Sequence, residues 1–173
     1  MAKLLVLNIE RKESSRPNIR IHRTMVRQHS RIDVHHHSLP DFYVQAVKAS
    51  VDVSGAPAPV TTIEDNLYIM DKIGVATAII SLSAPGAEIA KTVDESRDLA
   101  RRCNEYGASF RKSNPGRLGY FAALPSINDI EGCIAEIIYA LDEQKADGVT
   151  LFTSSGKKYL GHPDFIPIWK ELA

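Results

Sequence analysis

The sequence has little of what marks secreted, membrane-spanning or nucleic-acid-binding proteins. It has only two cysteines, Cys103 and Cys133, among 173 residues. Two cysteines are too few for a disulfide scaffold, so we expect a reducing compartment, the cytoplasm. No uninterrupted apolar run approaches the roughly 18 residues that span a bilayer, so neither a transmembrane protein nor a membrane partner is expected.

Charge of one sign is not in excess, because 21 basic side chains are balanced by 21 acidic ones. A neutral chain has no general attraction for nucleic acid, which we therefore do not expect as a partner. The balance is uneven along the chain, since residues 1–30 carry a net charge of +5 and the remainder −5. We expect residues 1–30 to form a flexible basic extension. A mitochondrial transit peptide is the alternative, because the segment is rich in arginine.

From residue 31 onward, strand-like segments alternate with helix-like ones. Apolar runs predict strands at 32–34, 75–82, 117–124 and 148–153. Helical patterns follow at 41–50, 63–73, 93–110, 130–141 and 163–172. Four strands that are each followed by a helix predict an α/β fold with four βα units and parallel strands, which would make residues 31–173 one domain.

Local signals set the ends of two of these helices. Thr62 and Gly74 are typical of the start and the end of the helix at 63–73. Asn128 or Asp129 is expected to cap the helix that follows it. The glycine-rich motifs of nucleotide-binding loops, GxGxxG and GxxxxGK[ST], are absent, which argues against a nucleotide site. In parallel α/β folds the active site lies at the carboxyl ends of the strands, so polar residues there are the candidates.

Three consecutive histidines, His35, His36 and His37, follow the first predicted strand. Side chains two residues apart on a strand point to the same face, so His35 and His37 are expected together and His36 on the other side. Two neutral imidazoles at one strand end suit a divalent transition metal such as zinc, with manganese or iron as alternatives. Asp33 shares the face of the pair and could orient an imidazole N–H or the strand end. The other interpretation is three partly exposed loop histidines, against which a buried strand before them and Pro40 after them both argue.

Hydroxyl side chains at two other strand ends are weaker candidates for binding a substrate. Ser81 and Ser83 follow the second predicted strand, and Thr153, Ser154 and Ser155 follow the fourth. Such residues more often cap helices or stabilise turns, which is the alternative here. Cys103 and Cys133 fall within predicted helices and are expected to pack in the core rather than act as nucleophiles. His162, between glycine and proline, is expected in a surface turn.

The segment 32–40, IDVHHHSLP, resembles the first-strand signature of the amidohydrolase-related metal-dependent decarboxylases, the aminocarboxymuconate-semialdehyde and fungal 6-methylsalicylate decarboxylase type. The similarity covers nearly everything after residue 30. It extends through SLSAPG at 81–86, GRLGYFAALP at 116–125 and ADGVTLFTSSGKKYLGHPDFIPIWKEL at 146–172.

This resemblance implies a (β/α)8 TIM barrel, of which residues 31–173 are the N-terminal half. It places the His-x-His metal ligands of the family on His35 and His37. It also implies a divalent metal, zinc first and manganese as the alternative, and no organic cofactor. The implied reaction is the non-oxidative decarboxylation of a small aromatic or unsaturated carboxylic acid, 6-methylsalicylate- or orsellinate-like, in fungal polyketide metabolism.

The family's remaining catalytic groups come from later strands, namely a metal-binding His, a second His and an Asp. No residue of this chain matches them, because the sequence stops in the helix after the fourth strand. We therefore expect the chain by itself to be catalytically weak or inactive. Three interpretations stay open: a decarboxylase, a hydrolase of the same superfamily, and an inactive half-barrel. The half-barrel would pair with itself, as a homo-oligomer, or with a complementary half.

Overall fold

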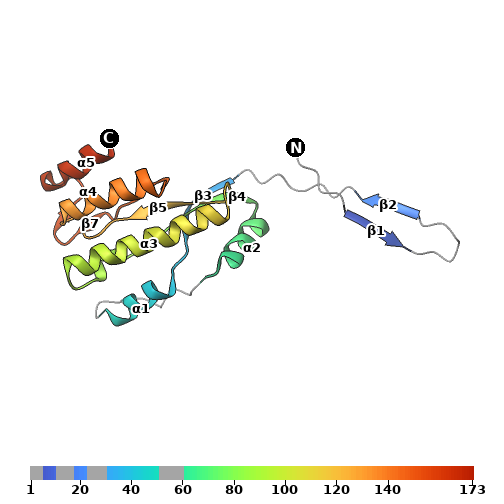
Figure 1. The fold of residues 1–173 in the computed structure, drawn as a ribbon, viewed down its shortest axis with the longest axis horizontal. Helices are drawn as coiled ribbons and strands as arrows, with labels where there is room; N and C mark the ends of the chain where they lie inside the picture. The colour runs from blue at the N-terminus through green and yellow to red at the C-terminus, as the bar shows by residue number, and fades with distance from the viewer. Residues whose placement is uncertain (1–5, 11–17, 23–30, 51–60) are drawn as a thin grey trace.

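The computed structural model describes residues 6–10, 18–22, 31–50 and 61–173 (Figure 1). Its main strands are β3 (Arg31–His37), β4 (Val75–Ser81), β5 (Leu118–Ala123) and β6 (Gly148–Thr150). Its α-helices are α1 (Asp41–Ala49), α2 (Ile63–Ile73), α3 (Val93–Ser113), α4 (Ile130–Ile138) and α5 (Ile166–Leu172). Shorter helical turns are η1 (Gly86–Ile89), η2 (Tyr139–Glu143) and η3 (Pro163–Phe165). No helix in these ranges is long and apolar enough to cross a membrane.

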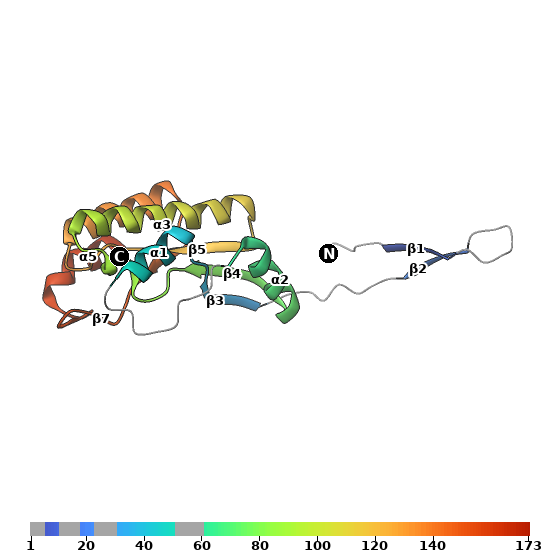
Figure 2. The same cartoon turned by 90° about the horizontal axis from the view of Figure 1, so that it is seen from below.

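The four main strands form one parallel sheet in the order β3-β4-β5-β6. Each strand is followed by at least one helix, and Figure 2 shows α3 and α4 along the same side of the sheet. Sequential order, parallel pairing and helical connections are the construction of a (β/α)8 barrel, of which four units are present. The predicted α/β half-barrel is confirmed.

Alternate side chains of the two central strands build the core beneath the helices. Ala78 and Ile80 of β4 and Tyr120 of β5 are buried on the same side of the sheet. They pack in one cluster with Met70 of α2 and Phe110 of α3. Because side chains alternate along a strand, the remaining side chains of β4 and β5 point to the other face of the sheet, which is the interior face of a barrel.

The predicted helix ends are confirmed where the sequence supplied a cap. The Thr62 hydroxyl accepts from the Asp65 backbone N–H, and Asp65 accepts in return from the Thr62 N–H, which completes a capping box. Gly74 ends α2 with φ 76°, a left-handed conformation that glycine adopts at little cost. Of the two candidates at the start of α4, Asp129 is the cap, because its carboxylate accepts from the Gly132 N–H.

Asp129 also forms an ion pair that joins α4 to α3. Its two carboxylate oxygens lie 2.6 and 2.7 Å from Nε and Nη2 of Arg97. These bonds to Arg97, together with the Gly132 N–H, lower the pKa of Asp129 below its ordinary value of 3.8. The ionised carboxylate therefore contributes to stability at neutral pH.

A buried polar network holds the carboxyl end of β5 against α3 and α4. The Asn104 side chain donates to the Ala123 carbonyl at 2.8 Å and accepts from the Ala123 N–H at 2.7 Å, in the manner of a neighbouring strand. Asn104 also donates to the Glu136 carboxylate, which Arg101 pairs at 2.8 Å. Burial raises the pKa of Glu136, and these two donors oppose that effect. Every member is bonded, so the network fixes the position of the strand end.

Several predicted elements differ in the structure. The fourth strand is shorter than expected, because β6 ends at Thr150 and residues 151–153 leave the sheet. A small antiparallel pair, β7 (Ser154–Ser155) and β8 (Lys158–Tyr159), follows where only a loop was expected. The expected burial of the first strand is wrong, since Ile32 and Val34 of β3 are 66% and 60% exposed. Strand β3 is the edge of the sheet, and no described helix covers those side chains.

The basic extension contains paired strands that the sequence analysis did not predict. Strand β1 (Val6–Glu10) pairs antiparallel with β2 (Asn18–His22). Residues 1–5, 11–17 and 23–30 lie outside the described residues. The separation of residues 1–30 from the domain at 31–173 stays a prediction.

Replacing Asn104 with alanine should lower the free energy of unfolding by about 2–4 kcal/mol, because it leaves two buried backbone groups without their partner and removes one donor from the Glu136 carboxylate. Urea unfolding followed by circular dichroism measures this. Asn114→Ala is the matched control, since the Asn114 side chain bonds only an exposed neighbouring hydroxyl among the described residues, and its loss should cost less than about 0.5 kcal/mol. Equal losses for the two variants would contradict the role of the network.

The Asp129 ion pair predicts a pH dependence of stability. A lowered carboxyl pKa stabilises the fold above the ordinary value of 3.8 and loses that contribution as the pH falls through the lower, folded-state value. Wild type should therefore be more stable than Asp129→Asn at neutral pH, and the difference should shrink below about pH 4. Unfolding at a series of pH values tests this, with exposed Asp142→Asn as control. A difference that stays constant down to pH 2 would refute it.

Candidate metal centre

A bulge in β3 decides where its three histidines point. Asp33 pairs with Ala78 of β4, whereas His36 pairs with Ile80, so β3 has one extra residue between them. After the bulge, His36 lies in register with the buried, helix-facing Ile80, and His37 lies in register with Ser81. His36 therefore lies on the opposite side of the strand from the His35–His37 pair, as predicted, and the bulge helps to produce this arrangement.

His35 and His37 come together as the sequence predicted. Their ring centroids are 5.0 Å apart and their planes meet at 74°. Two imidazoles bound to one tetrahedral zinc, each with a Zn–N distance of about 2.0–2.1 Å, would place their centroids roughly 5 Å apart. Both residues are exposed, so an ion can reach them from solvent. The ring separation of the pair is thus compatible with two ligands of one metal.

The backbone of β4 orients the His37 ring. His37 Nδ1 lies 3.0 Å from the Ser81 carbonyl oxygen and 3.3 Å from the Ser81 hydroxyl. A carbonyl only accepts, so this contact assigns the proton to Nδ1 and leaves the lone pair on Nε2. An imidazole held at one nitrogen by a carbonyl, with the other nitrogen free, is the usual arrangement of a metal-binding histidine. Ser81 thus contacts the His37 ring, and its contact with a substrate stays a prediction.

Asp33 contacts the strand end, as predicted, but it bonds the His36 ring rather than the rings of the His35–His37 pair, so the predicted face that it shares with the pair is wrong. Its Oδ1 accepts from the His35 backbone N–H at 3.0 Å, and its Oδ2 lies 3.0 Å from His36 Nδ1. These contacts lower the pKa of Asp33, the backbone bond to His35 most of all. The bulge turns the carboxylate toward His36, so it stabilises the backbone below the pair instead of its rings.

His36 connects the strand to α2. Its Nε2 lies 3.0 Å from the Asn66 side-chain oxygen, and Asn66 is almost fully buried. The Asn66 amide group in turn donates to the Ser38 hydroxyl at 3.2 Å. This chain of contacts anchors the chain on both sides of His37, and so holds His37 in place. The sequence did not predict Asn66, because a polar residue inside a helix gives no such signal by itself.

The histidine pair has no third ligand in the part of the chain that the structure describes. No group of three or more His, Cys, Asp or Glu side chains there could hold a metal ion. Catalytic zinc sites usually have three protein ligands and an open position for water or substrate. By themselves His35 and His37 supply two of the three protein ligands that such a site usually has.

Three of the five hydroxyl residues predicted to contact a substrate, Ser83, Thr153 and Ser154, form no hydrogen bond with the histidine pair in the described part of the chain. Ser83 donates to the adjacent Ala84 carbonyl, as a turn residue does. Thr153 and Ser154 are exposed, and none of the three hydrogen-bonds to His35 or His37 among the described residues. Their role in substrate binding stays a prediction.

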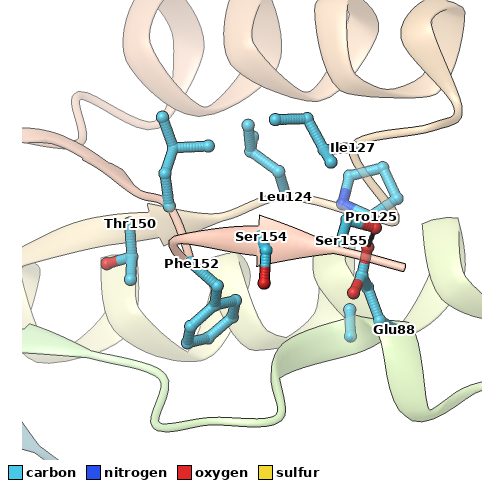
Figure 3. Close-up of a pocket in the computed structure, with 10 residues that line it drawn as sticks. Glu88, Leu124, Pro125, Ile127, Thr150, Phe152, Ser154 and Ser155 are labelled. Carbon is cyan, nitrogen blue, oxygen red and sulfur yellow. Dashed lines mark hydrogen bonds between the residues drawn. The ribbon is translucent and has the colours of Figure 1, made fainter. Parts of the chain in front are cut away.

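A small, partly open pocket lies at the carboxyl ends of β5 and β6 (Figure 3). Its lining includes Phe152, Ser154 and the buried Ser155. The Ser155 hydroxyl bonds the Glu88 carboxylate and accepts from Asn128 at 2.8 Å, which ties the β6–β7 segment to η1. Ser155 therefore has a structural role, the alternative considered for it. Sequence reasoning did not identify Glu88, since an isolated acidic residue in a turn is normally a solvated one.

The remaining candidates have the structural roles expected of them. Cys103 and Cys133 are buried and free, and burial raises the pKa of each thiol to about 12. Such thiols are poor nucleophiles at neutral pH. His162 is partly exposed and its Nδ1 accepts from the Asp164 N–H, so it caps the η3 turn.

Comparison with known proteins assigns the family. The family model described as Amidohydrolase matches residues 32–173. The chain is 45% identical over 146 residues to a 6-methylsalicylic acid decarboxylase of Aspergillus aculeatus, which covers 83% of this chain and 44% of that protein. The chain thus spans less than half the length of this curated relative.

Solved structures give the same fold over the same half. A crystal structure of an amidohydrolase II matches with a TM-score of 0.77 and 34% identity, over 83% of this chain and 47% of that one. A manganese-bound 5-carboxyvanillate decarboxylase of Novosphingobium aromaticivorans matches with a TM-score of 0.73 and 21% identity, over 82% and 47%. Sequence and fold agree over nearly all of the chain after residue 31, and this chain belongs to the amidohydrolase family.

Proposed function

We propose that residues 31–173 supply one half of a metal-dependent, non-oxidative decarboxylase of a small aromatic carboxylic acid. The observation that carries the proposal is the 45% identity to a 6-methylsalicylic acid decarboxylase across the region that contains the histidine pair. An acid of the 6-methylsalicylate or orsellinate type is the proposed substrate. The sequence alone also left a hydrolase open, and the similarity to decarboxylases favours the lyase.

His35 and His37 are the proposed metal ligands of this half. Their 5.0 Å ring separation and the free Nε2 of His37 support the assignment. Zinc is the proposed ion because imidazole ligands suit it, and manganese is the alternative, supported by the manganese-bound relative from Novosphingobium. No organic cofactor is proposed.

The residues of this chain would position the ion and part of the substrate. A bound divalent metal would supply Lewis-acid polarisation and a template for the carboxylate and a neighbouring oxygen of the substrate. The Ser81 carbonyl holds the His37 ring in the orientation that this requires. Ser83, Thr153 and Ser154 are proposed to contact the substrate from the carboxyl ends of β4 and β6. We assign no residue of this chain to the protonation of the ring carbon that loses carbon dioxide.

The two free cysteines are buried, which supports the cytoplasm as the proposed compartment.

The histidine assignment predicts the behaviour of metal-binding variants. Replacing His35 or His37 with alanine should weaken zinc binding about 10–100-fold or more, because each removes one of two donors. Competition with a chromophoric zinc chelator measures the affinity. His162→Ala is the matched control, since His162 is a turn histidine remote in sequence from β3, and it should leave the affinity unchanged. Equal effects of the His162 and His37 variants would contradict the assignment.

The activity is best tested in a chain of full length. A chimera would carry residues 31–173 in place of the matching segment of the Aspergillus aculeatus 6-methylsalicylic acid decarboxylase. With added zinc or manganese it should release carbon dioxide from 6-methylsalicylate, and His37→Ala within it should reduce the rate at least 100-fold, about 2.7 kcal/mol.

Residues 1–173 alone should show no turnover under the same conditions. A folded, metal-loaded chimera without activity would contradict the proposed function, as would activity that survives the loss of both His35 and His37. Robust turnover by residues 1–173 alone would contradict the idea that this half needs further catalytic groups.

A further inference from the structure

The small pocket at the carboxyl ends of β5 and β6 is lined mainly by apolar side chains (Figure 3). They come from three connections of the fold, since Ala87 follows β4, Leu124 and Ile127 follow β5, and Leu151 and Phe152 follow β6. Pockets for small molecules are typically apolar with a few polar groups that fix orientation. The carboxyl ends of parallel strands are also where (β/α)8 barrels bind their substrates. The pocket therefore has the place and the lining of a site for an apolar part of a substrate.

The polar side chains of the lining are mostly engaged within the protein. The Glu88 carboxylate accepts from the Ser126 hydroxyl at 2.9 Å and from the Ser155 hydroxyl. The Thr150 hydroxyl oxygen is buried, and in Figure 3 it points away from the Phe152 ring. Ser154 is exposed to solvent. A group in the pocket would thus meet mainly carbon, with the Ser154 hydroxyl within reach only on the open side.

Phe152 is held in place by the turn that follows β4. Gly86 in this turn has φ 73°, and a Cβ at this position would overlap the Phe152 ring. The absence of a side chain therefore allows both the left-handed backbone and the close approach of the ring. Phe152 is partly exposed on its remaining surface. Its ring is a fixed wall of the pocket rather than a free surface side chain.

The same turn leads back to the histidine pair. Ser81 at the end of β4 contacts the His37 ring, and Gly86 lies only five residues further along the chain. Five residues span at most about 18 Å even when fully extended. The buried Tyr43, six residues after His37, donates to the Ser83 carbonyl at 3.1 Å and accepts from the Gly86 N–H at 3.1 Å. The wall of the pocket and the histidine pair are therefore held by one short turn.

From these contacts we infer that the pocket selects an alkyl substituent on the ring of the aromatic acid, and that Phe152 is the residue that determines this specificity. The inference rests on the proposed decarboxylase function and adds to it the choice among acids. A methyl group suits a small apolar pocket. A hydroxyl or carboxylate in its place would lose hydrogen bonds to water without replacement.

Binding of simple phenols to residues 1–173 tests the inference without metal or turnover. The probes are phenol, 3-methylphenol and 3-propylphenol, of which 3-methylphenol is the compound left when 6-methylsalicylate loses carbon dioxide. In NMR spectra of methyl-labelled protein, 3-methylphenol should shift the signals of Leu124, Ile127 and Leu151. It should bind at least about fourfold more tightly than phenol, the factor expected for burial of one methyl group. The propyl compound should bind more weakly than 3-methylphenol, because the pocket is small.

Replacing Phe152 with alanine should enlarge the pocket and reverse this order, so that 3-propylphenol binds more tightly than 3-methylphenol. A variant that merely failed to fold could not gain affinity in this way. Phe42→Ala is the matched control, since Phe42 of α1 is also partly buried but packs against Tyr106 of α3. It should keep the wild-type order. An unchanged order in the Phe152 variant, or the same reversal in the Phe42 variant, would overturn the inference. So would the absence of shifts at the three methyl-bearing residues, which would make the pocket a packing gap only.

The chimera that carries residues 31–173 separates the inference from the proposed function. Its kcat/KM should be about tenfold or more higher for 6-methylsalicylate than for salicylate, and Phe152→Ala should remove this preference. An inactive chimera, together with the expected order of phenol binding, would refute the proposed function and support the inference. An active chimera that treats the two acids alike would overturn the inference and leave the proposed function in place.

Discussion

The parallel pairing of β3 with β4 is the interaction on which the candidate site depends. One extra residue in β3 places His36 in register with Ile80 and His37 in register with Ser81. His36 then bonds Asn66 of α2, and the His37 ring meets the Ser81 carbonyl. The bulge thus converts three consecutive histidines into one structural residue and one pair of exposed imidazoles. Without that pairing the same residues would be three loop histidines with no common orientation.

The same sheet also explains why the site is unfinished. A parallel sheet is normally covered on both faces or closed into a barrel, and this one has four strands with an edge at each end. The helices that cover β4 and β5 leave Ile32 and Val34 of β3 exposed. In the part of the chain that the structure describes, the same four strands leave two sheet edges and two candidate metal ligands, whereas a (β/α)8 barrel has eight strands and draws its site from the ends of several of them. Whatever closes the barrel therefore also decides the chemistry at the histidine pair.

Local sequence signals predicted most of the fold. Thr62 and Gly74 mark the start and the end of α2 as expected, and the predicted apolar runs form β4 and β5. The pairing of His35 with His37 followed from strand alternation. The bulge could not be predicted, because it depends on the register of β3 against β4. The bulge in turn directs the Asp33 carboxylate toward His36 instead of the His35–His37 pair. The exposure of β3 was missed for a related reason: an apolar run predicts a strand, whereas burial depends on what lies beside it. Ser155, Glu88 and Asn66 find their partners across the fold, where no spacing rule applies.

The proposed metal centre requires His35 and His37 to act together as ligands of one ion. Anomalous diffraction at the zinc absorption edge, from crystals grown with zinc, tests this most directly. It should show one peak about 2.0–2.1 Å from Nε2 of His37 and from an imidazole nitrogen of His35. A peak bound by His36 and Asp33 instead, or zinc held by His162 with none at the pair, would contradict it.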